Sequence, residues 1–531
     1  MQRTLIRGGL VVDGTGGEPV KADVLVEDGH IARVAPGLEA ADALLLDASG
    51  KAVTPGFIDI HRHCDIAALN DPRFGAAELA QGLTTVVGGN CGLSLAPMSE
   101  AHAAQAEAHI APCLGPARGL RFDDGGAYMR ALAAKPPRVS MGMLVGLGAV
   151  KAAVKGFEKA PFAPCEMARA RELISRALDA GMLGLSMGVM YSPECYNSSG
   201  EYVSLLSAAA PYGRPVCCHI RGEGDGLVAS VREVIGWGER AGIPVHISHF
   251  KCTGIRNWGR GVFEAVAEIE AARARGLDVT CDVYPYDAGA TTLSSLLPPC
   301  VLEDDNERLW DKLGTVRGVE EVRGALSRPH AGWDNMAVSI GWERIRIGGA
   351  ELGDGYDCAG KDLDAIARER GWDDPVHALC EILFRTRGNA GVVVHSMAPG
   401  DVDAAVRLPY AAIISDALYG EGPSHPRRYG AFTRALRDLV HERKVLTLAE
   451  AVHKMTELPA RRLGIRDVGA LSPGMRADIC VFDPTRVRDH ATYAEPERMS
   501  TGMDMVLMNG RIVWREEQPL DAPGASRVVL A

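Results

Sequence analysis

The middle of the chain, from about residue 55 to 465, alternates short apolar runs with helix-like segments. The apolar runs are rich in Val, Ile and Leu, as in strands buried on both faces of a parallel sheet. Helical segments such as Cys165–Ala180 and Gly226–Ala241 separate several of them. About eight such units in one region favour a (β/α)8 barrel over an open sheet. The predicted strands are Phe57–Ile60, Thr84–Val87, Val139–Val145, Leu183–Ser186, Pro215–His219, Val245–His249, Leu277–Tyr284, Val392–Val394 and Ala412–Ser415.

Three regions depart from this alternation. Residues 1–54 and 466–531 read as short strands with turns, including Asn509-Gly510, a strong hairpin signal. We therefore predict one small β-sandwich domain built from both chain ends, with the barrel spanning residues 55–465. The stretch from about 287 to 390 is too long for one connection, so we predict an insertion over the barrel mouth, a candidate lid.

Composition and charge limit the partners and the cellular compartment that we expect for the protein. A net charge of −11 without a long basic run argues against nucleic acid as a partner. Thirteen cysteines without a framework spacing indicate a reducing compartment. The sequence shows neither a signal-peptide pattern nor an uninterrupted apolar stretch long enough for a membrane span. We expect a soluble cytoplasmic protein that binds a small molecule; the oligomeric state is left open.

The first predicted strand of the barrel ends in two histidines, His61 and His63. Side chains two residues apart on a strand point the same way, so both can aim at one point beyond the strand. Active sites of such barrels lie at the carboxyl ends of the strands. An isolated pair of this kind is weak evidence for a metal site. The residues at the ends of the other strands therefore decide whether a metal site is predicted.

Further polar residues follow other predicted strands: Cys91 the second, His219 the fifth, His249 the sixth and Asp416 the eighth. Each alone fits a structural role, as a buried thiol, a core histidine or a helix cap. Together with the first pair they supply four histidines, a thiolate and a carboxylate, enough for one or two zinc ions. His246 and His249 differ in strand parity. We choose His249 as the ligand because it ends the strand, and we expect a structural role for His246.

Motifs spread over nearly the whole chain match one known family. They are Pro55-Gly-Phe-Ile-Asp-Ile-His-Arg-His63, Gly88–Gly92, Gly184–Gly188 with Tyr191, His219–Glu223, Ile247–Lys251, Asp282–Tyr286, Ser415-Asp416 with His425–Arg427, and Gly474–Asp483. On these motifs the sequence resembles the N-acyl-D-amino-acid deacylases, or D-aminoacylases, of the amidohydrolase superfamily. The family's activity would be zinc-dependent hydrolysis of a linear amide, releasing a carboxylate and a D-amino acid.

The resemblance also implies residue roles. Cys91, His219 and His249 would hold one zinc tightly, and His61 with His63 would form a second, weaker site. Asp416 would shuttle the proton as general base and acid. Substrate-binding roles, several of them at the substrate carboxylate, would belong to Lys251, Tyr191, Arg221, Glu223, Tyr284, Tyr286 and Arg427.

The chemistry of these residue types supports amide hydrolysis independently of the resemblance. Zinc lowers the pKa of bound water to about 7, and one carboxylate can accept that proton and return it to the amine. Two alternatives stay open: hydrolysis of a cyclic amide, imide or dipeptide-like substrate on the same site, or a non-catalytic binding barrel. Phe250 stands where the family often has histidine, so substrate preference is not settled by the motifs.

Overall fold

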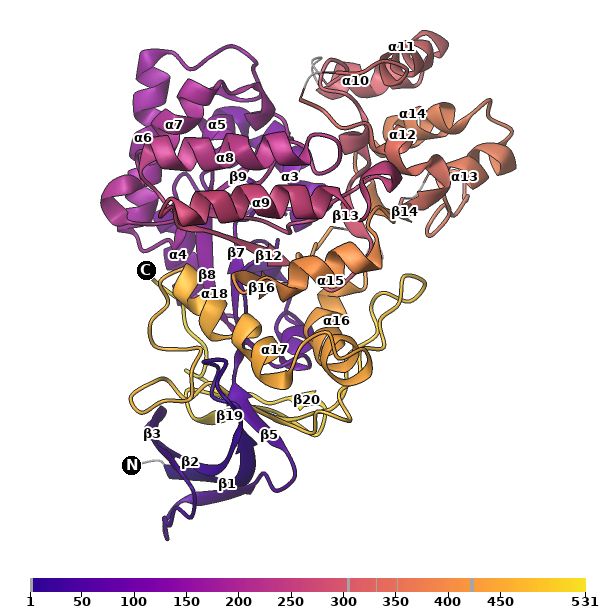
Figure 1. Ribbon diagram of the computed structural model, residues 1–531. Coiled ribbons are helices and arrows are strands. Elements are labelled where there is room, and N and C mark those ends of the chain that lie inside the picture. Colours follow the sequence, from indigo (N-terminus) through magenta and orange to yellow (C-terminus); the bar gives the residue numbers. More distant parts are fainter. Residues whose placement is uncertain (1–2, 303–305, 331, 351, 421–424) are drawn as a thin grey trace.

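The structure is a computed structural model that describes residues 3–302, 306–330, 332–350, 352–420 and 425–531. It has three parts: a barrel of parallel strands wrapped by helices, a β domain at the base, and a helical insertion to one side of the barrel mouth (Figure 1). The indigo N-terminal and yellow C-terminal segments lie together in the β domain, although they are far apart in sequence.

The barrel strands are parallel and neighbour one another in chain order. The last strand closes on the first, where a parallel bridge joins Arg62 to Ala417 and the Asp416 amide donates to the His61 carbonyl at 2.9 Å. This confirms the predicted (β/α)8 barrel. Its strands are β6 (Phe57–Asp59), β7 (Leu83–Gly88), β8 (Ser140–Gly146), β9 (Gly184–Gly188), β10 (Val216–His219), β11 (Val245–Ile247), β12 (Val279–Val283) and β16 (Ala411–Ile413).

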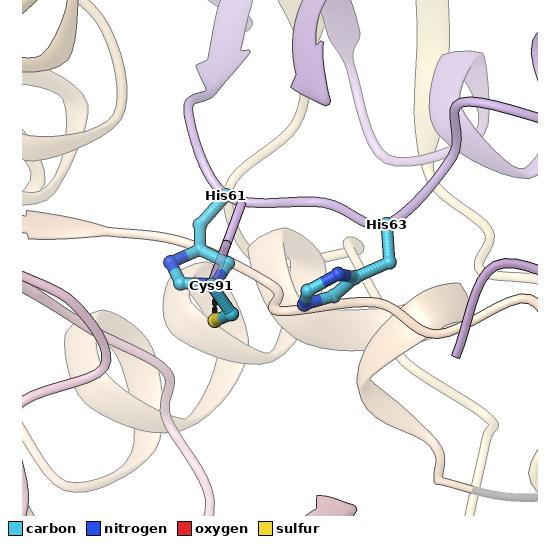
Figure 2. A group of neighbouring side chains, drawn as sticks. All are labelled: His61, His63 and Cys91. Atoms are coloured by element: carbon cyan, nitrogen blue, oxygen red, sulfur yellow. Dashed lines mark hydrogen bonds between the residues drawn. The ribbon is translucent and has the colours of Figure 1, made fainter. Parts of the chain in front are cut away.

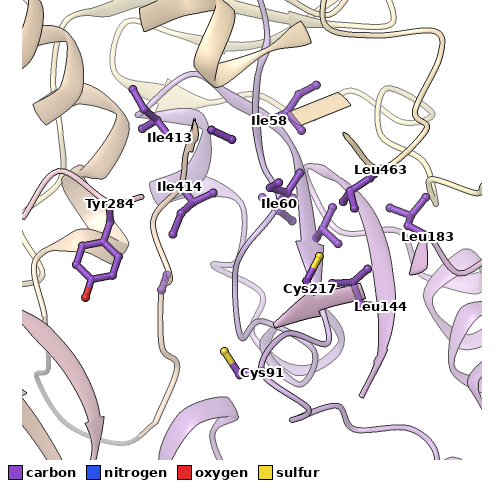
Figure 3. Packing of buried hydrophobic residues seen from close by; sticks show 14 of the residues in the cluster. Ile58, Ile60, Cys91, Leu144, Leu183, Cys217, Tyr284, Ile413, Ile414 and Leu463 are labelled. Atoms are coloured by element: carbon purple, nitrogen blue, oxygen red, sulfur yellow. The ribbon is translucent and has the colours of Figure 1, made fainter. Parts of the chain in front are cut away.

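Apolar side chains fill the barrel and bind its helices to the strands. Ile58, Leu144 and Ile413 come from three different strands and belong to one buried cluster (Figure 3). Within the described residues no helix is long and apolar enough to cross a membrane. The helices around the barrel include α3 (Ala103–Leu114), α4 (Gly125–Ala134), α5 (Leu147–Lys155), α6 (Pro164–Asp179), α7 (Ser199–Leu206), α8 (Leu227–Ala241), α9 (Gly261–Ala274), α15 (Pro399–Arg407), α16 (Arg427–Arg434), α17 (Leu448–Met455) and α18 (Glu457–Arg462).

The β domain is one hydrogen-bonded sheet that joins both chain ends through the antiparallel pair β5 and β17. The Asn509-Gly510 turn has positive φ at both residues, as the sequence signal requires. The strands are β1 (Arg3–Val11), β2 (Val20–Glu27), β3 (His30–Ala35), β4 (Leu44–Asp47), β5 (Ala52–Pro55), β17 (Ile479–Phe482), β18 (Met503–Met508), β19 (Arg511–Arg515) and β20 (Gln518–Pro519).

The insertion has its own sheet and its own apolar core. The expectation that Val392–Val394 continues the alternation of barrel strands is wrong, because this run pairs antiparallel with two insertion strands. A short buried apolar run looks the same in either sheet, so its pattern could not assign it. The insertion elements are β13 (Gly289–Thr292), β14 (Ile345–Gly349), β15 (Gly391–Val394), α10 (Asn306–Leu313), α11 (Val316–Leu326), α12 (Met336–Ile340), α13 (Leu363–Arg370) and α14 (Pro375–Thr386).

Candidate metal centre and substrate cavity

The predicted ligands converge at the carboxyl ends of the barrel strands. The ligand atoms of His61, His63 and Cys91 lie within 4.8 Å of one another, and so do those of Cys91, His219 and His249. The Cys91 Sγ atom is 3.3 Å from His61 Nε2 and 3.5 Å from His249 Nε2. Figure 2 shows Cys91 against the His61 ring, with His63 beside them. Cys91 thus occupies the position that a bridging thiolate would need.

Three of the predicted functional residues have a left-handed backbone: Cys91 (φ 54°), His249 (φ 36°) and Asp416 (φ 54°). This conformation is uncommon outside glycine, and residues that adopt it cluster at functional sites. In each case a barrel strand ends two or three residues earlier, as β11 does at Ile247. His249 therefore lies in a turn beyond its strand, and strand parity does not decide its direction.

The donor set fits zinc. Burial and the nearby Asp416 raise the pKa of the Cys91 thiol well above its ordinary value, so a bound cation would be needed to ionise it. Burial lowers the pKa of His63 to about 4 and holds that of His219 well below its ordinary value, which keeps both imidazoles neutral. Their Nδ1 atoms are buried and have no hydrogen-bond partner within the part of the chain that the structure describes. Neutral imidazoles and a thiolate are the ligands that zinc prefers.

Asp416 lies beside this cluster. Its Oδ1 atom is 3.3 Å from His63 Nε2 and 3.5 Å from His61 Nε2. Its Oδ2 atom is 2.8 Å from Arg427 Nη1, and both side chains of this ion pair are buried. Although burial alone would raise it, Arg427 and His61 hold the pKa of Asp416 well below its ordinary value. The carboxylate is therefore ionised and ready to accept a proton.

Asp282 contacts two of the predicted ligands, His61 and His249, and was not among the predicted site residues. Its Oδ2 atom is 2.9 Å from His246 Nε2 and 3.4 Å from His61 Nδ1, and its Oδ1 atom accepts from the His249 amide. The interaction with Nδ1 leaves His61 Nε2 facing Cys91. The signal that could have identified Asp282 is a lone carboxylate within the apolar strand β12. The contacts of His246 agree with the structural role expected for it.

Glu223 and Lys251 form an ion pair next to His249. The Glu223 Oε1 atom is 3.1 Å from His249 Nδ1, so the carboxylate can orient this imidazole with Nε2 towards Cys91. Lys251 is largely buried, and its ammonium lies 5.9 Å from the centre of the Tyr284 ring. A buried cation next to the ligands is suited to attract an anionic substrate group.

Four of the five predicted ligands, all but His61, border a cavity of about 60 Å³, which we call the metal cavity. Of the predicted substrate-binding residues, Tyr191, Glu223, Lys251 and Tyr284 line it. Met190 also lines it, with its Sδ atom 2.7 Å from His219 Nε2, although no sequence motif pointed to Met190. The full lining is His63, Cys91, Leu93, Cys113, Met190, Tyr191, His219, Glu223, His249, Lys251, Thr253, Tyr284, Gly289, Ala290, Thr291, Met336, Val394, Ser396, Asp416 and Leu418.

Three predicted substrate-binding residues do not line this cavity. Arg221 turns away because Glu233 on α8 holds its guanidinium at 3.0 Å. Tyr286 packs against His425, with ring centres 5.0 Å apart. Arg427 lies behind Asp416 as its ion-pair partner. Arg221 and Tyr286 therefore lie outside the walls of the metal cavity, and Arg427 lies beside the Asp416 carboxylate, which lines it.

A barrel of this topology, with a β domain from both chain ends and Cys, His and Asp side chains clustered at its strand ends, defines an amidohydrolase. A model of the Amidohydrolase family matches residues 360–514. An N-acyl-D-glutamate deacylase of Alcaligenes xylosoxydans xylosoxydans is 34% identical over 98% of this chain and 95% of its own length. A D-aminoacylase of the same organism is 33% identical over 99% and 97%.

Solved structures agree with these relatives. An N-acyl-D-glutamate deacylase from Bordetella bronchiseptica, complexed with zinc and a phosphonate inhibitor, superimposes with a TM-score of 0.84 at 33% identity over both complete chains. A D-aminoacylase described by its binuclear metal center gives a TM-score of 0.82 at 32% identity over 99% of each chain. The chain belongs to the D-aminoacylase family of N-acyl-D-amino-acid deacylases.

Proposed function

We propose that this protein hydrolyses the amide bond of linear N-acyl-D-amino acids with the help of zinc, releasing a carboxylate and a D-amino acid. The observation that carries the proposal is the cluster of Cys91 with two pairs of histidines next to an ionised Asp416. The D configuration rests on the names of the relatives, which include deacylases of N-acyl-D-glutamate and N-acyl-D-aspartate.

Three overlapping groups of ligand atoms are available for metal, and the third joins Asp416 to His61 and His249. We assign metal to the two groups that contain Cys91 and keep Asp416 for proton transfer. Cys91, His219 and His249 would hold one zinc tightly, and His61 with His63 would form a weaker second site that shares the thiolate. Zinc, when bound, supplies the Lewis acidity that acidifies water and polarises the amide carbonyl. The protein supplies the fixed positions of these ligands, because Asp282 and Glu223 orient the imidazoles behind them.

Asp416 would move the proton. As a carboxylate it accepts a proton from the attacking water and then gives it to the leaving nitrogen, which would otherwise depart as a poor amide anion. Arg427 holds the second oxygen at 2.8 Å, so the first oxygen keeps facing the ligand cluster. The backbone hydrogen bond from Asp416 to His61 fixes the same geometry from the main chain.

Lys251 would bind the α-carboxylate of the substrate. It is the one lysine or arginine side chain among the described residues lining the metal cavity, and it lies two residues beyond His249. A cation at this position favours a linear substrate with a free carboxylate over a neutral cyclic amide. Tyr284 lines the same cavity and would share the carboxylate through its hydroxyl group.

Replacing Lys251 with methionine should raise KM for an N-acyl-D-amino acid by about 30-fold or more, because losing a buried ion pair costs about 2–5 kcal/mol. The matched control is the corresponding amino-acid amide, which has no carboxylate to lose. Steady-state kinetics on both compounds measure the difference. Equal losses for the acid and the amide would contradict the role of Lys251 and would point to disturbance of Glu223 and His249 instead.

A further inference from the structure

A second cavity, which we call the outer chamber, adjoins the metal cavity. The two share four wall residues, Leu93, Cys113, Met190 and Tyr191. The outer chamber has a volume of about 90 Å³, compared with about 60 Å³ for the metal cavity. A group that leaves the metal cavity past Met190 therefore enters a larger cavity.

The shared wall includes a contact between the barrel and the insertion. The Tyr191 hydroxyl lies 3.2 Å from Thr291 Oγ1 on β13. Thr291 lines the metal cavity, and the next residue, Thr292, lines the outer chamber. The passage between the two cavities is thus bounded by both parts of the protein.

The outer chamber is suited to an apolar occupant. Its walls carry Phe157, Leu297, Trp310 and Trp333, which come from the barrel side and from the insertion. Among its described lining residues no carboxylate occurs, and the one arginine, Arg387, is ion-paired with an aspartate. Burial lowers the pKa of His109 in the same wall to about 4, so this imidazole is neutral at physiological pH.

The residues of the predicted carboxylate site do not border the outer chamber. Lys251 and Tyr284 line the metal cavity and are absent from the lining of the outer chamber. Met190, by contrast, borders both cavities and touches His219. In an N-acyl amino acid the acyl carbons and the α-carboxylate extend in opposite directions from the scissile bond. With the carboxylate at Lys251, the acyl group therefore points towards Met190 and the outer chamber.

We propose that the outer chamber binds an apolar acyl group of about six or more carbons, so that the protein prefers medium-chain or arylalkanoyl N-acyl amino acids to N-acetyl ones. Because a water-sized group occupies about 10–15 Å³ of such volume, the chamber has room for about six of them. This inference rests on the proposed deacylase function and adds the identity of the acyl group to it.

The first test compares zinc-loaded protein on acetyl, butanoyl, hexanoyl and octanoyl derivatives of one D-amino acid. We expect kcat/KM to rise at least tenfold from acetyl to octanoyl, because each buried methylene contributes about fourfold. A flat or falling series would overturn the inference while leaving the deacylase function intact.

Calorimetry with the products octanoate and acetate gives a second readout, and we expect octanoate to bind at least tenfold more tightly. Turnover of none of these substrates would instead contradict the proposed function, while octanoate binding would still test the chamber.

The second test narrows the outer chamber from its wall. Ala108 on α3 lines it, whereas Ala104, one turn earlier, does not. Ala108→Phe should lower kcat/KM for the octanoyl substrate at least tenfold and leave the acetyl substrate unchanged, and Ala104→Phe should change neither. Equal losses on both substrates, or no change in acyl preference, would overturn the assignment. A changed preference for the amino-acid side chain instead would assign the outer chamber to that group and would also overturn it.

Discussion

Replacing Asp416 with asparagine should lower kcat by about 10³-fold or more while the protein keeps its tightly bound zinc. General acid–base catalysis by one group contributes about 10²–10⁴-fold, and Asp416 is proposed to act both as base and as acid. The asparagine has nearly the same shape but cannot accept the proton. Zinc is retained because Cys91, His219 and His249 form a group of ligands without Asp416. Steady-state kinetics and metal analysis of the purified variant measure the two effects.

A buried aspartate far from the metal cavity controls for the loss of a carboxylate as such. Asp478 is buried in the β domain and pairs with Arg476 at 3.0 Å. Asp478→Asn should leave kcat within a few-fold of the wild type. Wild-type activity of Asp416→Asn would show that Asp416 takes no part in the reaction. Loss of zinc from that variant would show that Asp416 is a metal ligand instead of a proton shuttle.

Replacing Cys91 with alanine should abolish tight zinc binding and, with it, turnover. Cys91 is the one thiol in the described ligand groups and belongs to two of the three groups, one with His61 and His63 and one with His219 and His249. The change removes a ligand and its negative charge from both of these groups at once, whereas loss of a histidine removes a neutral ligand. Metal content after gel filtration and turnover at saturating substrate measure the result.

Cys113 offers a matched control for this change. It lines the same cavity and is also buried, but it belongs to no metal-binding group of the described residues. Cys113→Ala should keep the wild-type zinc content and should lose little activity. If Cys91→Ala retained one tightly bound zinc, the ligand assignment would be wrong and the histidines alone would hold the metal.

The fold and the ligand cluster were predictable because their signals are periodic and local. Alternating strands and helices indicate the barrel, and the position of His61 after a buried strand places it at the carboxyl end. The same reasoning placed His219, which is the last residue of β10. Placing these two histidines requires only the position at which each strand ends.

The features that could not be predicted depend on turns and on distant partners. The direction of His249 is set by a left-handed turn beyond β11, which strand parity cannot describe. Arg221 was predicted at the substrate because of its motif, yet Glu233 on α8 draws it away. Tyr286 has the same residue type and spacing parity as Tyr284 but packs against His425. Strand β12 ends at Val283, before both tyrosines, so strand parity does not predict their directions.

The most direct test measures free-amine release from paired N-acyl-D- and N-acyl-L-leucine, each with an acetyl and an octanoyl group. Zinc-loaded protein is compared with protein stripped by a chelator and then reconstituted. We predict turnover of the D compounds only, lost with the metal and restored by zinc. Turnover that does not depend on zinc, or hydrolysis of the L series in preference to the D series, would contradict the account.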